Sequence, residues 1–274
     1  MNLLEVNHLS RRYGDFIAVD DISFSLQAGE LLALIGPNGA GKSTTFNMIG
    51  GQLPVTSGSI LLDGESIVDL PARRIWKKGV GRTFQIAATF NSFTVLQNIQ
   101  NALLSYRRRT FCIWQAADRL YRQDACALLE QVGMLAQADR PCSELAYGDI
   151  KRVELAMALA SEPRLLLMDE PTAGMAPGER QALMALTRDI AQARNTGVLF
   201  TEHSMDVVFG FADRILVLAR GQLIAQGTAQ AIRDDPKVRQ VYFGTGPSLQ
   251  GDSDSNAPQP FSPGQRACTG ATQS

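Results

Sequence analysis

The 274-residue sequence contains no apolar run that approaches the roughly 20 residues a membrane-spanning helix needs. Its first residues, MNLLEVNHLSRRY, carry acidic and polar side chains where a signal peptide would have its apolar stretch. We therefore expect a chain that has no transmembrane segment or export signal and that works in the cytosol.

The sequence also lacks a strong charge of either sign, with 26 basic against 27 acidic side chains. Such a balance gives no broad field to attract nucleic acid, and we expect no nucleic-acid partner. The four cysteines form no CxxC pair, and the two histidines lie far from them in sequence. This pattern predicts reduced thiols rather than a cysteine and histidine metal site.

The sequence does contain enough apolar residues, 45%, to bury a sizeable core. Segments typical of strands fill residues 3–35, whereas helical periodicity dominates residues 95–160. Two further apolar runs, 164–170 and 196–203, flank a helical segment at 178–194. Short apolar strands that alternate with helices predict an α/β fold with a parallel sheet buried on both faces.

The last part of the chain contains a predicted hairpin followed by a segment of a different composition. Residues 214–227 read as a hairpin around Arg220 and Gly221. From about residue 245 the chain is rich in Gly, Ser, Pro, Gln and Asp, which predicts a disordered tail over 245–274.

The stretch GPNGAGKST matches the phosphate-binding pattern GxxxxGK[ST], and it lies between an apolar strand and a helical segment as that pattern requires. Its residues are Gly36, Pro37, Asn38, Gly39, Ala40, Gly41, Lys42, Ser43 and Thr44. Backbone amides of such a loop close around phosphates, Lys42 can reach the β and γ phosphates, and the Ser43 hydroxyl can ligate Mg²⁺. An ordinary glycine turn would need neither side chain at these spacings.

Polar residues also follow the two later apolar runs. Asp169 and Glu170 end the first run, and we expect them at the carboxyl edge of the sheet, where ligands of open α/β sheets bind. There Asp169 would hold the Mg²⁺ shell and Glu170 would polarise an attacking water. His203 follows the second run, and a contact with the γ-phosphate is favoured over a structural role.

A third feature is the entry to a helical segment that continues from Ile150. A Ser, Thr, Asn or Asp would ordinarily cap such a helix. The residues here are instead Ala146, Tyr147, Gly148 and Asp149. This entry raises the question of what the helix N-terminus faces.

Five stretches, GPNGAGKST, GRTFQ ending at Gln85, LAYGD, LLLMDEP and TEH, occur in the order and spacing of ATP-binding cassette (ABC) ATPases. The sequence resembles this family over residues 1 to about 244. The resemblance implies an α/β fold with a P-loop NTPase core and a mainly parallel sheet. It also implies an N-terminal antiparallel β-subdomain and an α-helical subdomain at about 88–162.

The resemblance further implies ATP and Mg²⁺ as ligands. Gln85 would sense Mg²⁺ and the attacking water, and would communicate with membrane subunits. Tyr13 would stack on adenine, although an exposed tyrosine in a turn is the simpler alternative. The helix N-terminus formed by Ala146, Tyr147, Gly148 and Asp149 would face the γ-phosphate bound by an opposite subunit, which is a general use of helix N-termini.

Within the family, the Ala-Tyr-Gly sequence, the EPTAGMAP turn and the ending PKVRQVYFG resemble cassettes of importers for branched-chain amino acids, urea and short amides. They also resemble the lipopolysaccharide-export cassette. The importer resemblance implies two transmembrane permease subunits, a second identical or paralogous cassette and, indirectly, a solute-binding protein. The chain would lie on the cytoplasmic face of the bacterial inner membrane. A soluble mechanical ATPase without a membrane partner is a further alternative.

Overall fold

The computed structural model describes residues 2–83, 89–107 and 121–243. All of them fall within one structural unit, Met1–Gly244. Gln85 and the expected tail at 245–274 lie outside the described residues.

The N-terminal sheet is antiparallel and has the strand order β2-β1-β4-β5. Its strands are β1 (Asn2–Tyr13), β2 (Phe16–Gln27), β4 (Ser57–Leu62) and β5 (Glu65–Ser66). A tight turn joins β1 to β2, so that Tyr13 pairs directly with Phe16. Paired residues of this kind project from the same face of a sheet.

The second sheet has the strand order β10-β9-β3-β8-β7-β6. Its strands are β3 (Leu31–Ile35), β6 (Val80–Thr83), β7 (Leu165–Asp169), β8 (Gly197–Thr201), β9 (Arg214–Ala219) and β10 (Gln222–Gly227). Each pair is parallel except the β9–β10 hairpin. The register sets Asp169 opposite Thr201, so the carboxyl ends of β7 and β8 lie side by side.

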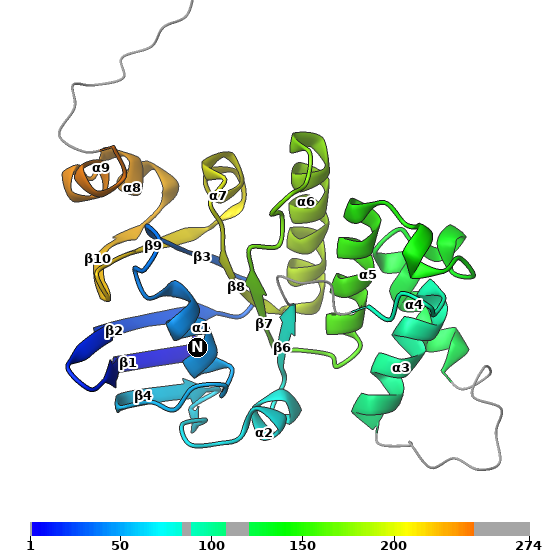
Figure 1. Cartoon of the computed structure of the whole chain (residues 1–274), viewed down its shortest axis with the longest axis horizontal. Helices are drawn as coiled ribbons and strands as arrows, with labels where there is room; N and C mark the ends of the chain where they lie inside the picture. Colours follow the sequence, from blue (N-terminus) through cyan, green and yellow to red (C-terminus); the bar gives the residue numbers. More distant parts are fainter. Residues whose placement is uncertain (1, 84–88, 108–120, 244–274) are drawn as a thin grey trace, which may run out of the picture. The chain divides into compact units, whose positions relative to one another are not determined.

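The parallel sheet is buried on both faces, because successive strand residues point to opposite sides. On β3, Leu32 and Leu34 pack with the N-terminal sheet and α1 (Lys42–Ile49), whereas Leu31 and Ala33 pack with the helices. Figure 1 shows α6 (Pro177–Arg194) and α7 (Met205–Phe211) on the side of the sheet opposite α1 and the N-terminal strands.

A group of three helices packs beside β7 and β6, and is drawn in green at the right of Figure 1. It contains α3 (Val95–Arg107), α4 (Arg122–Gln131) and α5 (Tyr147–Leu159), with short 3₁₀ turns at Leu135–Gln137 and Cys142–Glu144. Three smaller helices, α2 (Ala72–Lys77), α8 (Ala229–Asp234) and α9 (Pro236–Phe243), complete the described elements.

The observed fold confirms the expected α/β class with an antiparallel N-terminal sheet and a mainly parallel second sheet. Several short elements, β6 and α2 among them, were not predicted, because four and six residues are too few to display a clear periodicity. The helix expected from Ile150 begins three residues earlier, at Tyr147. Tyr147, Gly148 and Asp149 therefore form its first turn.

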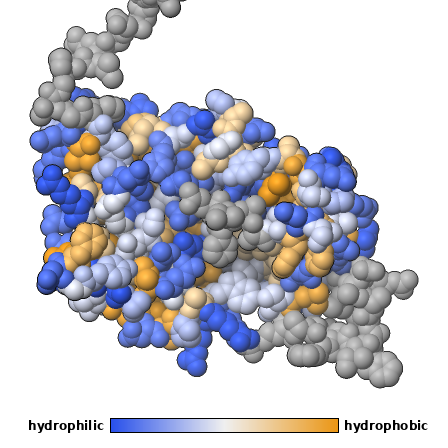
Figure 2. Space-filling model, in the orientation of Figure 1, coloured by the Kyte–Doolittle hydropathy of each residue, from blue (hydrophilic) through white to orange (hydrophobic). Residues whose placement is uncertain are grey.

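Among the described residues, no helix combines the length and apolar character that crossing a membrane requires. On the face drawn in Figure 2, hydrophobic residues form small patches scattered among polar ones.

The central strand β8 offers a direct test of the core. Phe200 is fully buried there, so Phe200→Ala removes its apolar contacts and leaves a cavity. We expect the free energy of unfolding to fall by about 3–5 kcal/mol. Leu135→Ala, at a site that is 42% exposed, is the matched control and should change it by less than about 0.5 kcal/mol. Urea denaturation measures both, and equal effects would contradict this packing.

Candidate active site

The loop of residues 36–41 joins the end of β3 to the start of α1. Gly41 precedes α1 with φ of 102°, and an added Cβ there would lie 2.7 Å from the Ala18 carbonyl oxygen. Only glycine is compatible with this backbone and this close approach. No side chain caps the helix, so its first amides are available to an anion.

Lys42 is buried at the start of α1, where its Nζ donates to the carbonyl oxygens of Gly36 at 2.6 Å and Pro37 at 3.2 Å. Burial lowers the pKa of the Lys42 ammonium, and the negative charges of Glu170 and Asp169 oppose that shift. The lysine therefore lies within the field of both carboxylates, although they follow it by more than 120 residues in the sequence.

Asp169 ends β7 with both carboxylate oxygens near protein groups. Its Oδ1 accepts a hydrogen bond from Thr201 Oγ1 at 2.7 Å, and its Oδ2 lies 3.5 Å from Arg82 Nη2. Thr201 comes from the neighbouring strand and also accepts the Glu170 amide at 3.0 Å. This hydroxyl fixes the ends of β7 and β8 together.

Glu170 adopts φ of 49°, a left-handed conformation that is unfavourable for a residue with a side chain. Its Oε1 lies 3.0 Å from His203 Nε2, so the two residues singled out from separate sequence motifs meet. Backbone strain of this kind persists where the surroundings hold it, and here the Glu170 amide is bound by Thr201.

Lys42, Glu170 and His203 line one cavity of about 240 Å³ together with the phosphate-binding loop. Its lining consists of Phe16, Ala18, Asn38, Gly39, Ala40, Gly41, Lys42, Ser43, Thr44, Glu170 and His203. It therefore combines the anion-binding loop and a cation with a carboxylate and an imidazole. That combination suits a phosphate chain and a water beside it.

The aromatic wall of this cavity differs in detail from the expectation. Phe16 lines it, whereas Tyr13 is exposed with the Arg11 guanidinium 4.4 Å from its ring centroid. Because Tyr13 pairs with Phe16 across the hairpin, the two residues project from the same face of the sheet.

The oxygen donors of the site suit Mg²⁺ more than a transition metal. Asp169, Glu170 and the Ser43 hydroxyl are hard oxygen ligands. In the described part of the chain, no group of three or more His, Cys, Asp or Glu side chains could hold a metal ion by itself. That result is compatible with Mg²⁺, which often takes one or two protein oxygens and completes its shell with phosphate and water.

The N-terminus of α5 does not line this cavity, since the lining includes none of Ala146, Tyr147, Gly148 and Asp149. No side chain caps the helix at Ala146. An added Cβ at Gly148 would lie 3.1 Å from the Glu179 carboxylate, so the α6 N-terminus packs closely here.

Sequence reasoning missed three residues that support the site. Arg82 and Thr201 contact Asp169, and the buried Glu202 accepts the Thr172 amide at 2.8 Å and its hydroxyl at 2.7 Å. Glu202 thereby holds the turn after Glu170. The available sequence signal was the position of Thr201 and Glu202 directly before His203.

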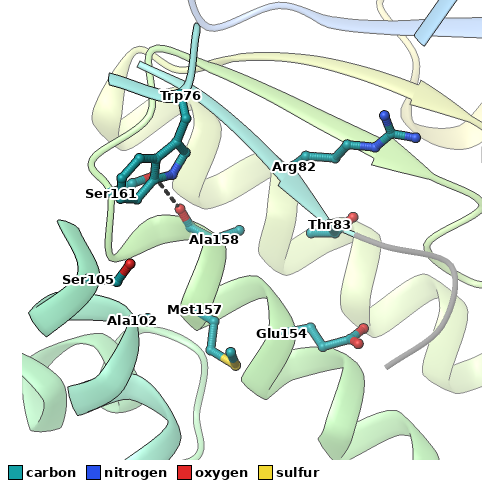
Figure 3. Close-up of a pocket in the computed structure, with 9 residues that line it drawn as sticks. All are labelled: Trp76, Arg82, Thr83, Ala102, Ser105, Glu154, Met157, Ala158 and Ser161. Carbon is teal, nitrogen blue, oxygen red and sulfur yellow. Dashed lines mark hydrogen bonds between the residues drawn. The ribbon is translucent and has the colours of Figure 1, made fainter. Parts of the chain in front are cut away.

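A second cavity, of about 320 Å³, lies between the helical group and β6. Figure 3 shows its lining, which comprises Trp76, Arg82, Thr83, Ala102, Ser105, Glu154, Met157, Ala158 and Ser161. Arg82 lines this second cavity and also contacts Asp169 of the candidate active site.

Comparison with known proteins agrees with this geometry. The sequence profile of the family described as "ABC transporter" matches residues 19–173. A second profile, described as "Branched-chain amino acid ATP-binding cassette transporter", matches residues 222–247.

Individual relatives cover nearly the same span. The chain is 38% identical over 250 residues to the high-affinity branched-chain amino acid transport ATP-binding protein LivG of Escherichia coli K12, covering 88% of this chain and 98% of that protein. It is 33% identical over 244 residues to the lipopolysaccharide export system ATP-binding protein LptB of Haemophilus influenzae, covering 89% and 98%.

A solved structure extends the likeness to the fold. The ADP conformation of an ATP-binding cassette from an ABC transporter superposes with a TM-score of 0.80 at 30% identity, covering 89% of this chain and 99% of that one. From the profile match, the relatives and the fold together, the chain belongs to the ATP-binding cassette family as an ABC transporter ATPase.

Proposed function

We propose that the chain binds Mg·ATP in the 240 Å³ cavity and hydrolyses it to drive a membrane transporter. The observation that carries this proposal is the contact of Glu170 with His203 at 3.0 Å, beside the loop that holds Lys42. A base, an imidazole and an ammonium then surround the position of a terminal phosphate.

In this mechanism the amides of residues 38–44 and Lys42 hold the phosphate chain. Glu170 accepts a proton from the attacking water, whose oxygen bonds to the γ-phosphorus as the bond to the bridging oxygen breaks. His203 orients Glu170 and donates toward the γ-phosphate. Mg²⁺, held through Ser43 and Asp169 with Gln85 as a further ligand, would neutralise charge on the phosphates.

A complete site requires a second cassette in this proposal. The N-terminus of α5 does not line the cavity of its own chain, and no side chain caps its amides. It consists of Ala146, Tyr147, Gly148 and Asp149. Those amides could bind an anion, such as the γ-phosphate of ATP held by a second cassette. ATP would therefore close two cassettes, identical or paralogous, and hydrolysis would let them separate.

We further propose import of branched-chain amino acids or related small solutes, such as urea and amides. The profile match at residues 222–247 and the likeness to the LivG protein support this choice. The partners would be two permease subunits and, through them, a solute-binding protein, with this chain peripheral on the cytoplasmic face of the membrane.

The permease would dock on the surface beside the helical group. Phe90 and Phe93 are 56% and 39% exposed, and their ring centroids lie 5.4 Å apart. The buried Asn98 holds this turn by accepting the Phe90 amide at 2.8 Å. An ordered, exposed aromatic pair is suited to a protein interface, and the cavity of Figure 3 lies on the same helical group.

Glu170→Gln tests the proposed base. The amide cannot accept the proton, so we expect ATP turnover to fall by about 10²–10⁴-fold while ATP binding persists and a dimer accumulates in size-exclusion chromatography. Glu130→Gln, an exposed carboxylate on α4, is the control and should turn over normally. Wild-type turnover by Glu170→Gln would remove Glu170 from this role.

Tyr13→Ala tests base recognition at the β1–β2 hairpin. Loss of the stacking ring should weaken ATP binding by about 1–3 kcal/mol, whereas Tyr13→Phe should bind as wild type does. Fluorescence titration with labelled ATP measures both. If Tyr13→Ala binds normally and Phe16→Ala binds weakly, Phe16 is the stacking residue instead.

Co-purification of the tagged chain from membranes of its own host tests the partners. We expect two multispanning subunits and a second cassette to remain bound in mild detergent. Export-type membrane subunits would favour the lipopolysaccharide-export alternative, for which the likeness to the LptB protein speaks. Recovery without any membrane protein would favour a soluble mechanical ATPase.

A further inference from the structure

The side chain of Arg82 lies between the 320 Å³ cavity and Asp169. It is the third residue of β6, the edge strand beside β7. Its aliphatic stem lines the 320 Å³ cavity, and Figure 3 shows its guanidinium pointing away from the other lining residues. Arginine commonly places its stem against apolar groups while its charged end lies elsewhere.

Two polar side chains at the end of α1 hold the guanidinium in place. Its Nη1 donates to Asn47 Oδ1 at 2.9 Å and to the Gln52 side-chain carbonyl. Asn47 lies in the last turn of α1, where a cation is also favoured by the helix dipole. Arg82 thus links β6 to the C-terminal end of α1, the helix that follows the loop of residues 36–41.

The same guanidinium lies 3.5 Å from Asp169, through Nη2 and Oδ2. The two side chains are only 15% and 16% exposed, so solvent screens their interaction less than it would at the surface. The other oxygen of Asp169 is engaged by Thr201. The Asp169 carboxylate therefore has a positive charge beside it even when no metal is bound.

We propose that Arg82 is a resident counter-cation of Asp169 that sets the Mg²⁺ concentration needed for nucleotide binding. The inference rests on the proposed function, because it takes Asp169 as a Mg²⁺-shell residue. A divalent cation that approaches Asp169 is repelled by a guanidinium within a few ångströms, and the attraction of the carboxylate for the metal is reduced. Arg82 acts through Asp169 and is a positioning residue.

A Mg²⁺ titration of nucleotide binding to the full chain tests this role. The probe is a fluorescent, non-hydrolysable ATP analogue, titrated with MgCl₂ from an EDTA-treated start. In Arg82→Gln, we expect the half-saturating Mg²⁺ concentration to fall about five-fold, intermediate between the effects of surface and buried charge pairs. Arg82→Lys keeps the charge and should remain within about two-fold of wild type. Analogue binding in EDTA supplies the Mg²⁺-free baseline for each variant.

Two further variants isolate the cause. Arg164→Gln removes a charge that pairs with Asp63 elsewhere, and it should leave the titration unchanged. Asn47→Asp keeps Arg82 and adds a negative charge beside it, so it should also lower the Mg²⁺ requirement. This variant keeps the test valid if Arg82→Gln fails to fold.

The outcomes separate this inference from the proposed function. An unchanged or higher Mg²⁺ requirement in both Arg82→Gln and Asn47→Asp would overturn the role of Arg82. An equal fall in Arg82→Lys and Arg82→Gln would also overturn it, because charge would not be the cause. If the wild-type chain itself binds the analogue with no Mg²⁺ dependence, the proposed function fails first.

Discussion

The parallel pairing of β3, β8 and β7 is the constraint on which the site depends. In this register the three strands end at one edge, so the loop after β3, the Asp169–Glu170 pair and His203 meet although they are far apart in sequence. The apolar strands hold this arrangement because they are buried on both faces, between the helices and the N-terminal sheet. A slip by one residue would exchange the two faces and turn the buried leucines away from their partners.

Charge at this edge is balanced within the chain. Arg82 lies 3.5 Å from Asp169, and Lys42 is within the field of both Asp169 and Glu170. Each cation is held by uncharged oxygen acceptors as well, namely the Gly36 carbonyl for Lys42 and Asn47 for Arg82. The carboxylates can therefore remain at a largely buried strand end without ligand. Under the proposed function, a metal and a phosphate chain would enter a field that is already partly neutralised.

The sequence was sufficient to predict the groups that follow the strand ends, because each lies in a local motif whose strand could be recognised from its apolar run. The structure brings Lys42, Glu170 and His203 to one cavity. Arg82 could not be found in this way, since its contact with Asp169 depends on β6 pairing with β7, and β6 has only four residues. Glu202 was missed for a similar reason: its partner, Thr172, lies 30 residues away in a turn. The start of α5 at Tyr147 was also missed, because a first turn without a capping side chain leaves little local pattern.

Hydrolysis by the proposed mechanism requires two copies of this site, each completed by the other cassette. Phosphate release by the purified wild-type chain, measured against protein concentration with saturating Mg·ATP and with EDTA, tests it most directly. We expect Mg²⁺-dependent release whose rate rises with the square of protein concentration at low concentration, because turnover requires a pair of chains. Release that is linear in protein concentration would contradict the shared site, and no release at any concentration would contradict hydrolysis by this chain alone or as a homodimer.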